Sequence, residues 1–146
     1  MNVKFSYEEI SSEVKSAIAE IVGIEDEELH DDMSLISDLG IDSLDLVDLL
    51  FGLGRKFDVE ISIQYWTEKI HSESLKIEEV GVENTLLSIS ELTGLEFDEN
   101  DSNLLKELIS GDYQTWDVVR TILSFIKIKS LCRCIEIKTQ ENHNEK

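Results

Sequence analysis

The chain has 146 residues, and none of them is proline. Proline breaks helices because it has no backbone N–H and its ring clashes with the preceding turn. Since this residue is absent and apolar residues recur at helical spacing, the sequence predicts an all-α fold. Hydrophobic residues make up 41% of the chain, which is enough for a buried core in one domain of this length.

The first predicted helix, Tyr7–Val22, has well-marked ends. Ser6 and Glu9 have the spacing of a capping box, in which a hydroxyl and a carboxylate accept from free backbone N–H groups. Gly23 can adopt the left-handed conformation that ends many helices. The apolar positions of this helix are Tyr7, Ile10, Val14, Ile18 and Ile21.

The second predicted helix begins at Asp42 or Ser43 and ends near Phe57. Its apolar face consists of Leu46, Leu50, Leu53 and Phe57, widened by Leu44, Val47 and Phe51. Asp42, Asp45 and Asp48 recur every third residue and form an acidic stripe close to the start of the helix. Carboxylates there suit the positive end of the helix dipole.

The predicted elements beyond Ser62 are shorter. A short helix is predicted over Gln64–Ile70, followed by a helical pattern over Leu75–Thr93 that Gly81 divides and Gly94 ends. A further helical pattern covers Asp101–Ser110.

A last long helix is predicted from a cap at Thr115. Its buried side would consist of Val118, Val119, Ile122, Leu123, Phe125 and Ile126. The segment Ile126–Lys138 fits either a strand or a continuing helix, and a frayed polar tail is predicted from Thr139. The expected organisation is therefore one domain over residues 1–138 and a tail over residues 139–146.

The net charge of −19, from 32 acidic and 13 basic side chains, bears on possible partners. Such a field repels nucleic-acid phosphates and anionic membranes, which excludes non-specific nucleic-acid binding as the main role. It favours partner proteins with basic surfaces and speeds their encounter. No apolar run has the length of a membrane span.

The cysteines and histidines indicate no metal site. Cys132 and Cys134 are too close in sequence to form a disulfide without strain, and two thiols do not complete a zinc site. Reduced thiols are expected, in a cytoplasmic protein. His30, His71 and His143 lack the spacing of metal ligands. With no hydrolase elbow, Gly-rich phosphate loop or nucleophile–base pair, the sequence does not indicate an enzyme.

The most informative stretch is Leu39-Gly40-Ile41-Asp42-Ser43-Leu44, at the start of the second helix. It closely resembles the modification site of acyl carrier proteins, a loop of the form Leu-Gly-x-Asp-Ser-Leu. The resemblance runs from about residue 7 to residue 70 and resumes near residue 115. It implies a bundle of four helices like theirs, here with additional inserted helices.

The resemblance also implies the chemistry. Ser43, flanked by Gly40, Asp42 and Leu44, would accept a 4′-phosphopantetheine arm from coenzyme A through a phosphopantetheinyl transferase. The thiol of the arm would then hold an acyl chain as a thioester. A serine in the first helical turn is exposed, and a phosphodiester on it would lie near free backbone N–H groups.

Partner recognition and cargo binding are predicted on the second helix. Asp42, Asp45 and Asp48 would be read by basic surfaces of acyl-transferring or condensing enzymes of fatty-acid, lipid or polyketide synthesis. The candidates for lining an acyl pocket are Leu46, Val47, Leu50, Phe51, Ile70, Val119 and Ile122. The alternative for each of them is simple core packing.

The chain is longer than ordinary members of the family. Residues 66–70 resemble the third helix of the family and residues 115–119 the start of its fourth, which places an insertion at about residues 71–114. An alternative alignment takes Ile77–Thr93 as the fourth helix. The insertion would enlarge the acyl pocket or dock a dedicated partner, and the sequence does not choose between these roles.

Two features of the second helix depart from the family pattern. Arg55 and Lys56 are basic where many carriers are acidic, which leaves open which partners the chain shares with the fatty-acid pathway. Gly52 and Gly54 weaken the last turns, each by up to about 1 kcal/mol relative to alanine. A carrier of aminoacyl or peptidyl groups, and an interaction module that is never modified, remain as alternative functions.

Overall fold

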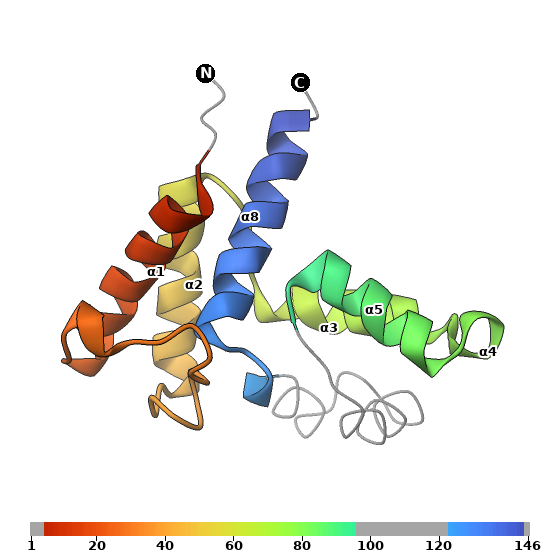
Figure 1. Ribbon diagram of the computed structural model, residues 1–146, viewed down its shortest axis with the longest axis horizontal. Coiled ribbons are helices and arrows are strands. Elements are labelled where there is room, and N and C mark those ends of the chain that lie inside the picture. Colours follow the sequence, from red (N-terminus) through yellow and green to blue (C-terminus); the bar gives the residue numbers. More distant parts are fainter. Residues whose placement is uncertain (1–4, 96–122, 145–146) are drawn as a thin grey trace.

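The computed structural model describes residues 5–95 and 123–144, and within these ranges the regular elements are helices (Figure 1). In chain order they are α1 (Tyr7–Val22), the 3₁₀ helix η1 (Asp26–Glu28), α2 (Ser43–Phe57), α3 (Ile63–Ser74), α4 (Ile77–Val80), α5 (Val82–Thr93) and α8 (Ile128–Asn144). The predicted all-α class with additional helices is confirmed. No helix of the described ranges is long and apolar enough to cross a membrane.

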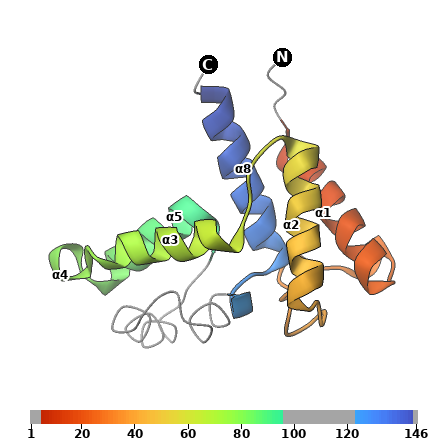
Figure 2. The same ribbon diagram turned by 180° about the vertical axis from the view of Figure 1, so that it is seen from behind.

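The helices form a bundle and a lateral extension, named here the helical arm, that consists of α3, α4 and α5 (Figures 1 and 2). Helices α1, α2 and α8 lie side by side, and α1 contacts both of the others. Helices α3 and α5 form an antiparallel pair that extends sideways from α8, with α4 at its far end. The bundle carries the stretch that resembles the modification site. Helix α3 contains residues 66–70, the predicted third helix, whereas α4 and α5 lie within the predicted insertion at about residues 71–114.

Helix α1 begins and ends as its sequence predicts. The Ser6 hydroxyl accepts from the Glu9 N–H at 3.1 Å, and the Glu9 carboxylate accepts from the Ser6 N–H at 3.3 Å. Gly23 ends the helix in the left-handed region with φ of 75°. Ile10, Val14 and Ile18 are fully buried, so this part of the predicted apolar face enters the core, whereas Ile21 near the end of the helix is exposed.

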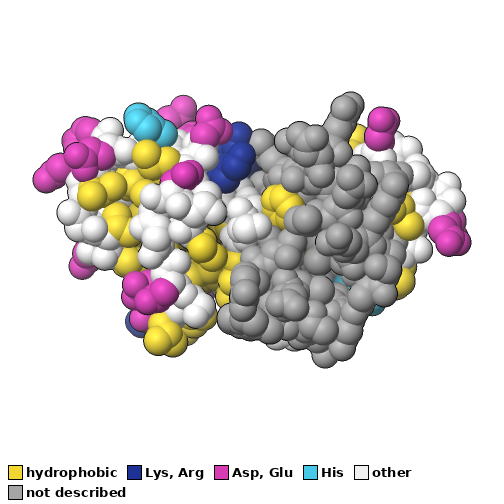
Figure 3. Space-filling view, turned by 90° about the horizontal axis from the view of Figure 1, so that it is seen from below, with side chains coloured by type: hydrophobic (Ala, Val, Ile, Leu, Met, Phe, Trp, Pro, Cys, Tyr) yellow, Lys and Arg dark blue, Asp and Glu magenta, His cyan; other side chains and the backbone are white. Residues whose placement is uncertain are grey.

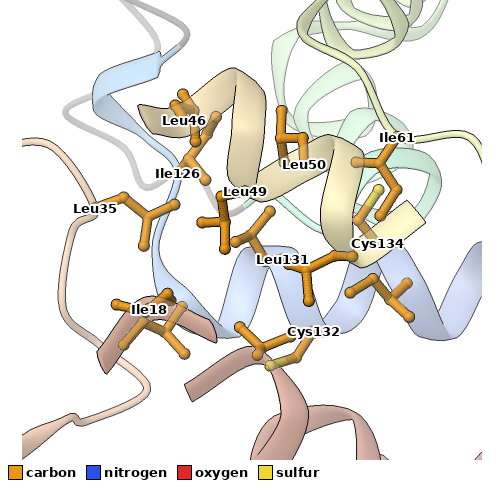
Figure 4. Close-up of a cluster of buried hydrophobic side chains, with 14 of the residues drawn as sticks. Ile18, Leu35, Leu46, Leu49, Leu50, Ile61, Ile126, Leu131, Cys132 and Cys134 are labelled. Carbon is orange, nitrogen blue, oxygen red and sulfur yellow. The ribbon is translucent and has the colours of Figure 1, made fainter. Parts of the chain in front are cut away.

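The bundle core is made by side chains of α1, α2 and α8 that point toward one another (Figure 4). Leu49 of α2 lies beside Leu131 of α8 there, and Leu46 of α2 lies beside Ile126. The core also contains Cys132 and Cys134, as well as Leu53, Phe57 and Ile135. Burial raises the pKa of Cys132 to about 11 and that of Cys134 to about 12. Both thiols are therefore protonated at neutral pH and act as small core residues.

The last helix differs from its prediction. Thr115 and half of the predicted buried side, namely Val118, Val119 and Ile122, lie outside the described residues, and the helix that closes the bundle begins at Ile128. Ile126 is buried but not helical, because the chain there forms an isolated antiparallel bridge between Lys127 and Ser34. A bridge to a distant loop is a tertiary contact that helical periodicity does not reveal.

The predicted polar tail is also corrected by the structure. Helix α8 continues to Asn144, and Thr139 is buried with its hydroxyl donating to the Glu136 carbonyl at 3.0 Å. The buried positions Leu131, Ile135 and Thr139 are four residues apart, so they share one face of the helix. The strand alternative for this region is wrong, because the region is helical and α8 packs against α1.

Polar contacts of Tyr65 and Trp66 join α3 to α5, and a further contact of Tyr65 reaches α8. The Trp66 indole, which is fully buried, donates to the Thr93 carbonyl at 3.1 Å. The Tyr65 hydroxyl donates to the Leu92 carbonyl at 2.8 Å, and the Lys138 ammonium lies 3.6 Å from the centroid of the Tyr65 ring. Burial raises the pKa of Tyr65 to about 12. The phenol therefore stays protonated and keeps donating over the physiological pH range.

Gly81 and Gly94 bound α5 as predicted, with φ of 87° and 78°. A Cβ at Gly94 would lie 2.9 Å from the Ser130 carbonyl oxygen, the Cys134 nitrogen and the Arg133 Cβ. The end of α5 therefore touches the backbone of α8 without room for a side chain.

We expect Gly94→Ala to lower the free energy of unfolding by about 2–4 kcal/mol, because it adds a clash to an unfavourable φ. Gly23→Ala is the matched control, since Gly23 has a similar φ of 75° and nothing within 4 Å of the added Cβ. That control should cost only about 1–2 kcal/mol. Urea denaturation followed by circular dichroism measures both, and equal losses would show that the close contact with α8 is absent.

Candidate functional site

Helix α2 begins at Ser43, with Asp42 as its N-cap. The Asp42 carboxylate accepts from the Asp45 N–H at 2.8 Å, and the Asp42 carbonyl accepts the first helical bond, from the Leu46 N–H at 2.9 Å. The side chains of Ser43 and Leu44 are exposed. Backbone N–H groups in the first turn of a helix have no intrahelical acceptor. An exposed hydroxyl beside such donors fits a phosphodiester, which the helix dipole also favours.

The two residues before Asp42 set the position of the serine. Gly40 has a φ of 68°, which favours glycine, and its N–H donates to the Ile36 carbonyl at 3.1 Å. Ile41 is buried, and its N–H donates to the Leu35 carbonyl at 3.0 Å. The loop therefore turns at Gly40 and is fixed to the core at Ile41, which leaves Asp42 and Ser43 facing outward.

Ser34 and Asp38 shape the loop further upstream. The Asp38 carboxylate accepts from the Ser34 N–H at 2.7 Å, and the Ser34 hydroxyl accepts from the Ser37 N–H at 3.1 Å. The Ser34 carbonyl accepts from the N–H groups of Asp38 and Leu39, each at 3.1 Å. Sequence reasoning missed this network, although short polar side chains that bond to nearby backbone are a recognised turn signal.

The same loop is bonded to the start of α8. The Leu35 N–H donates to the Ile126 carbonyl at 3.1 Å, and the Ile128 N–H donates to the Met33 carbonyl at 3.0 Å. The Lys129 ammonium lies 2.7 Å from the Asp32 carboxylate and lowers the pKa of that carboxyl. The segment that leads to Ser43 is thus held between two fixed points, the core and α8.

The predicted acidic stripe is on the surface. Asp42, Asp45 and Asp48 are all exposed, and none forms an ion pair with another described residue. Seen from the end of the bundle where α2 begins, acidic and hydrophobic side chains are interspersed and Lys and Arg cover only small areas (Figure 3). The site therefore presents negative charge and apolar surface together.

The predicted pocket residues separate into two groups. Leu46, Leu50 and Ile70 are buried, and Leu46 lies beside Ile126 in the bundle core (Figure 4). Val47 and Phe51 are instead 52% and 66% exposed, and Leu44 is 77% exposed. Leu44, Val47 and Phe51 are three and four residues apart, so they form one exposed apolar stripe, named here the α2 stripe. The remaining candidates, Val119 and Ile122, lie outside the described residues.

The basic residues near the end of α2 have different neighbours. Lys56 forms an ion pair with Glu13 of α1. The Arg55 guanidinium lies 5.8 Å from the centroid of the Phe51 ring, at the end of the α2 stripe. Gly54 is explained by a close neighbour, because an added Cβ would lie 2.7 Å from the Val59 carbonyl oxygen. Within the described ranges, no three His, Cys, Asp or Glu side chains are placed to hold a metal ion.

Comparison with known proteins identifies the same stretch. Residues 12–64 match the family model described as the phosphopantetheine attachment site, a range that contains Ser43 and most of α1 and α2. The cofactor of this family is 4′-phosphopantetheine. No solved structure matches the chain.

Several curated relatives are acyl carrier proteins. The acyl carrier protein AcpXL of Rhizobium meliloti is 35% identical over 80 residues, which cover 54% of this chain and 84% of the relative. AcpXL of Brucella melitensis is 34% identical over 80 residues, covering 54% and 86%. The acyl carrier protein of Thermotoga maritima is 46% identical over 56 residues, covering 38% and 69%. The chain therefore belongs to the acyl carrier protein family.

Proposed function

We propose that Ser43 carries the 4′-phosphopantetheine arm and that the chain presents acyl intermediates, as thioesters, to enzymes of fatty-acid, lipid or polyketide synthesis. The observation that carries the proposal is the exposed Ser43 hydroxyl at the first position of α2, inside the matched attachment region. The thiol of the bound arm supplies the thioester chemistry. The chain itself supplies attachment, orientation and recognition, and performs no catalysis in this proposal.

Each flanking residue has a separate role in orienting the arm. Asp42 caps α2 and fixes the direction in which the first turn starts. Gly40 permits the turn, and Ile41 anchors it, so that Ser43 stays exposed. A fixed attachment point matters because a partner must find the serine in one orientation before transfer can occur.

Partner enzymes are proposed to dock on the start of α2. Asp42, Asp45 and Asp48 suit a basic surface, which speeds encounter and fixes orientation. The α2 stripe adds apolar area of the kind that contributes most of the binding energy at an interface. The first partner would be a phosphopantetheinyl transferase, followed by acyl-transferring or condensing enzymes in the cytoplasm.

The acyl chain is proposed to contact the apolar interior near the phosphopantetheine arm. Leu46 and Leu50 are candidates from α2 and Ile70 from α3, since burial of alkyl groups is favourable by about 0.8 kcal/mol per CH₂. The names of the curated relatives support acyl rather than peptidyl cargo.

The acyl role is tested by using octanoyl-coenzyme A as the donor for a broad-specificity phosphopantetheinyl transferase. We expect the intact mass to rise by one octanoyl-phosphopantetheine group, and hydroxylamine then to remove the octanoyl group and leave the arm. Hydroxylamine treatment of protein loaded from plain coenzyme A is the control and should change nothing. An unaltered mass after incubation of folded protein with several transferases would favour the unmodified interaction module.

A further inference from the structure

A groove of about 360 Å³ runs between α1 and α2. From α1 it is lined by Glu13, Ser16, Ala17, Glu20 and Ile21, and from α2 by Asp48, Leu49, Gly52, Leu53 and Lys56. Gly52 of the groove lies about 140° around α2 from Val47 of the α2 stripe, because it follows Val47 by five residues at about 100° per residue. The groove is therefore a second surface of α2, which shares only Asp48 with the surface proposed for the enzymes that act on the phosphopantetheine arm.

Gly52 is not explained by packing within the described chain. A glycine inside a helix costs up to about 1 kcal/mol relative to alanine. Nothing lies within 4 Å of a Cβ added at Gly52, whereas a Cβ added at Gly54 would lie 2.7 Å from the Val59 carbonyl oxygen. The missing side chain at Gly52 leaves the groove open, and with Ala17 and Ser16 opposite it gives a helix from outside room for close approach.

The charges along the groove are polarised. Lys56, the only cation among its lining residues, is paired with Glu13. Glu20 and Asp48, toward the Ser43 end of α2, have no ion-pair partner among the described side chains. Between these ends the groove is floored by Leu49, Leu53 and the partly exposed Ile21.

We propose that this groove binds a basic amphipathic helix of a partner protein. The apolar floor and the small residues fit the apolar side of a helix, and the unpaired carboxylates fit lysine or arginine beside it. A second copy of this chain is disfavoured because each copy carries a net charge of −19. The acidic rim also disfavours anionic lipid, and it offers no advantage to an alkyl chain.

The proposal does not depend on the phosphopantetheine arm, so it can be tested on protein that lacks this group. The probe is an 18-residue amidated peptide with leucine at every third or fourth position flanked by lysine, and the comparison is a scrambled peptide of the same composition. We expect the amphipathic peptide to bind Ser43→Ala protein at least about tenfold more tightly than the scrambled one. Amide shift changes in NMR spectra should map to residues that line the groove.

Two variants with matched controls test the contacts. Gly52→Leu fills open space without disturbing the core and should weaken binding about tenfold, whereas Ser72→Leu on exposed α3 should not. Glu20→Lys should weaken it several-fold more than Glu78→Lys on α4, which makes the same change in net charge. Equal affinities for both peptides, or an unchanged affinity in Gly52→Leu, would mean that binding is diffuse attraction to an acidic protein and would overturn the proposal.

Discussion

Trp66→Ala is expected to lower the free energy of unfolding by about 3–5 kcal/mol, the usual cost of truncating a buried tryptophan. The Trp66 side chain is fully buried, and its indole N–H donates to the Thr93 carbonyl. Alanine would leave a cavity where α3 packs against α5 and would also leave that carbonyl without its donor. Urea denaturation followed by far-ultraviolet circular dichroism measures the loss.

Two further variants separate the causes. Trp66→Phe keeps most of the volume but loses the hydrogen bond, so its cost should be smaller, about 1–3 kcal/mol. Leu87→Ala truncates a side chain of α5 that is 59% exposed, and it should change stability by less than about 1 kcal/mol. If Trp66→Ala were as stable as Leu87→Ala, α3 would not be packed on α5 as described.

Leu44→Asn is expected to lower kcat/KM of the phosphopantetheinyl transferase for transfer of the phosphopantetheine arm by about 30-fold or more. Loss of an apolar contact at the centre of an interface has an effect of this size. Leu44 is 77% exposed and next to Ser43, so its removal should leave the core intact. The amide is neutral, which keeps the charge of the docking surface unchanged. The rate is measured from the accumulation of modified protein at several carrier concentrations.

Leu87→Asn is the control for this experiment, because it makes the same change on an exposed residue of α5. It should leave kcat/KM within about twofold of the wild-type value. A normal kcat/KM for Leu44→Asn would show that the transferase does not use the α2 stripe, and the docking proposal would have to move to another surface.

The ends of α1 and α2 could be predicted from sequence because their signals are local. The Ser6–Glu9 box, Gly23 and the Asp42 cap each act within one turn of the helix that they bound. The choice of Ser43 as the candidate serine rested on the resemblance of residues 39–44 to the modification site of acyl carrier proteins. Nothing nonlocal was needed to place Ser43 at the start of a helix with its hydroxyl outside the core.

Features that depend on contacts between distant segments could not be predicted. Helical periodicity did not show that the Lys127 segment bridges to Ser34, or that the last bundle helix begins only after it. Val47 and Phe51 are apolar in sequence but exposed in the fold. Helix α3 packs against α5, and this pairing between two separate helices could not be read from the sequence of α2. Gly52 and Gly54 are equivalent by composition, yet only the second meets a close neighbour.

The central claim is that the phosphopantetheine arm is attached to Ser43 and to no other serine. The most direct test is the intact mass of wild type, Ser43→Ala and Ser37→Ala after incubation with coenzyme A and a phosphopantetheinyl transferase. Ser37 is an exposed serine of the same loop, so its variant controls for damage to the loop. We expect one arm on wild type and on Ser37→Ala and none on folded Ser43→Ala, whereas an arm on Ser43→Ala would contradict the assignment.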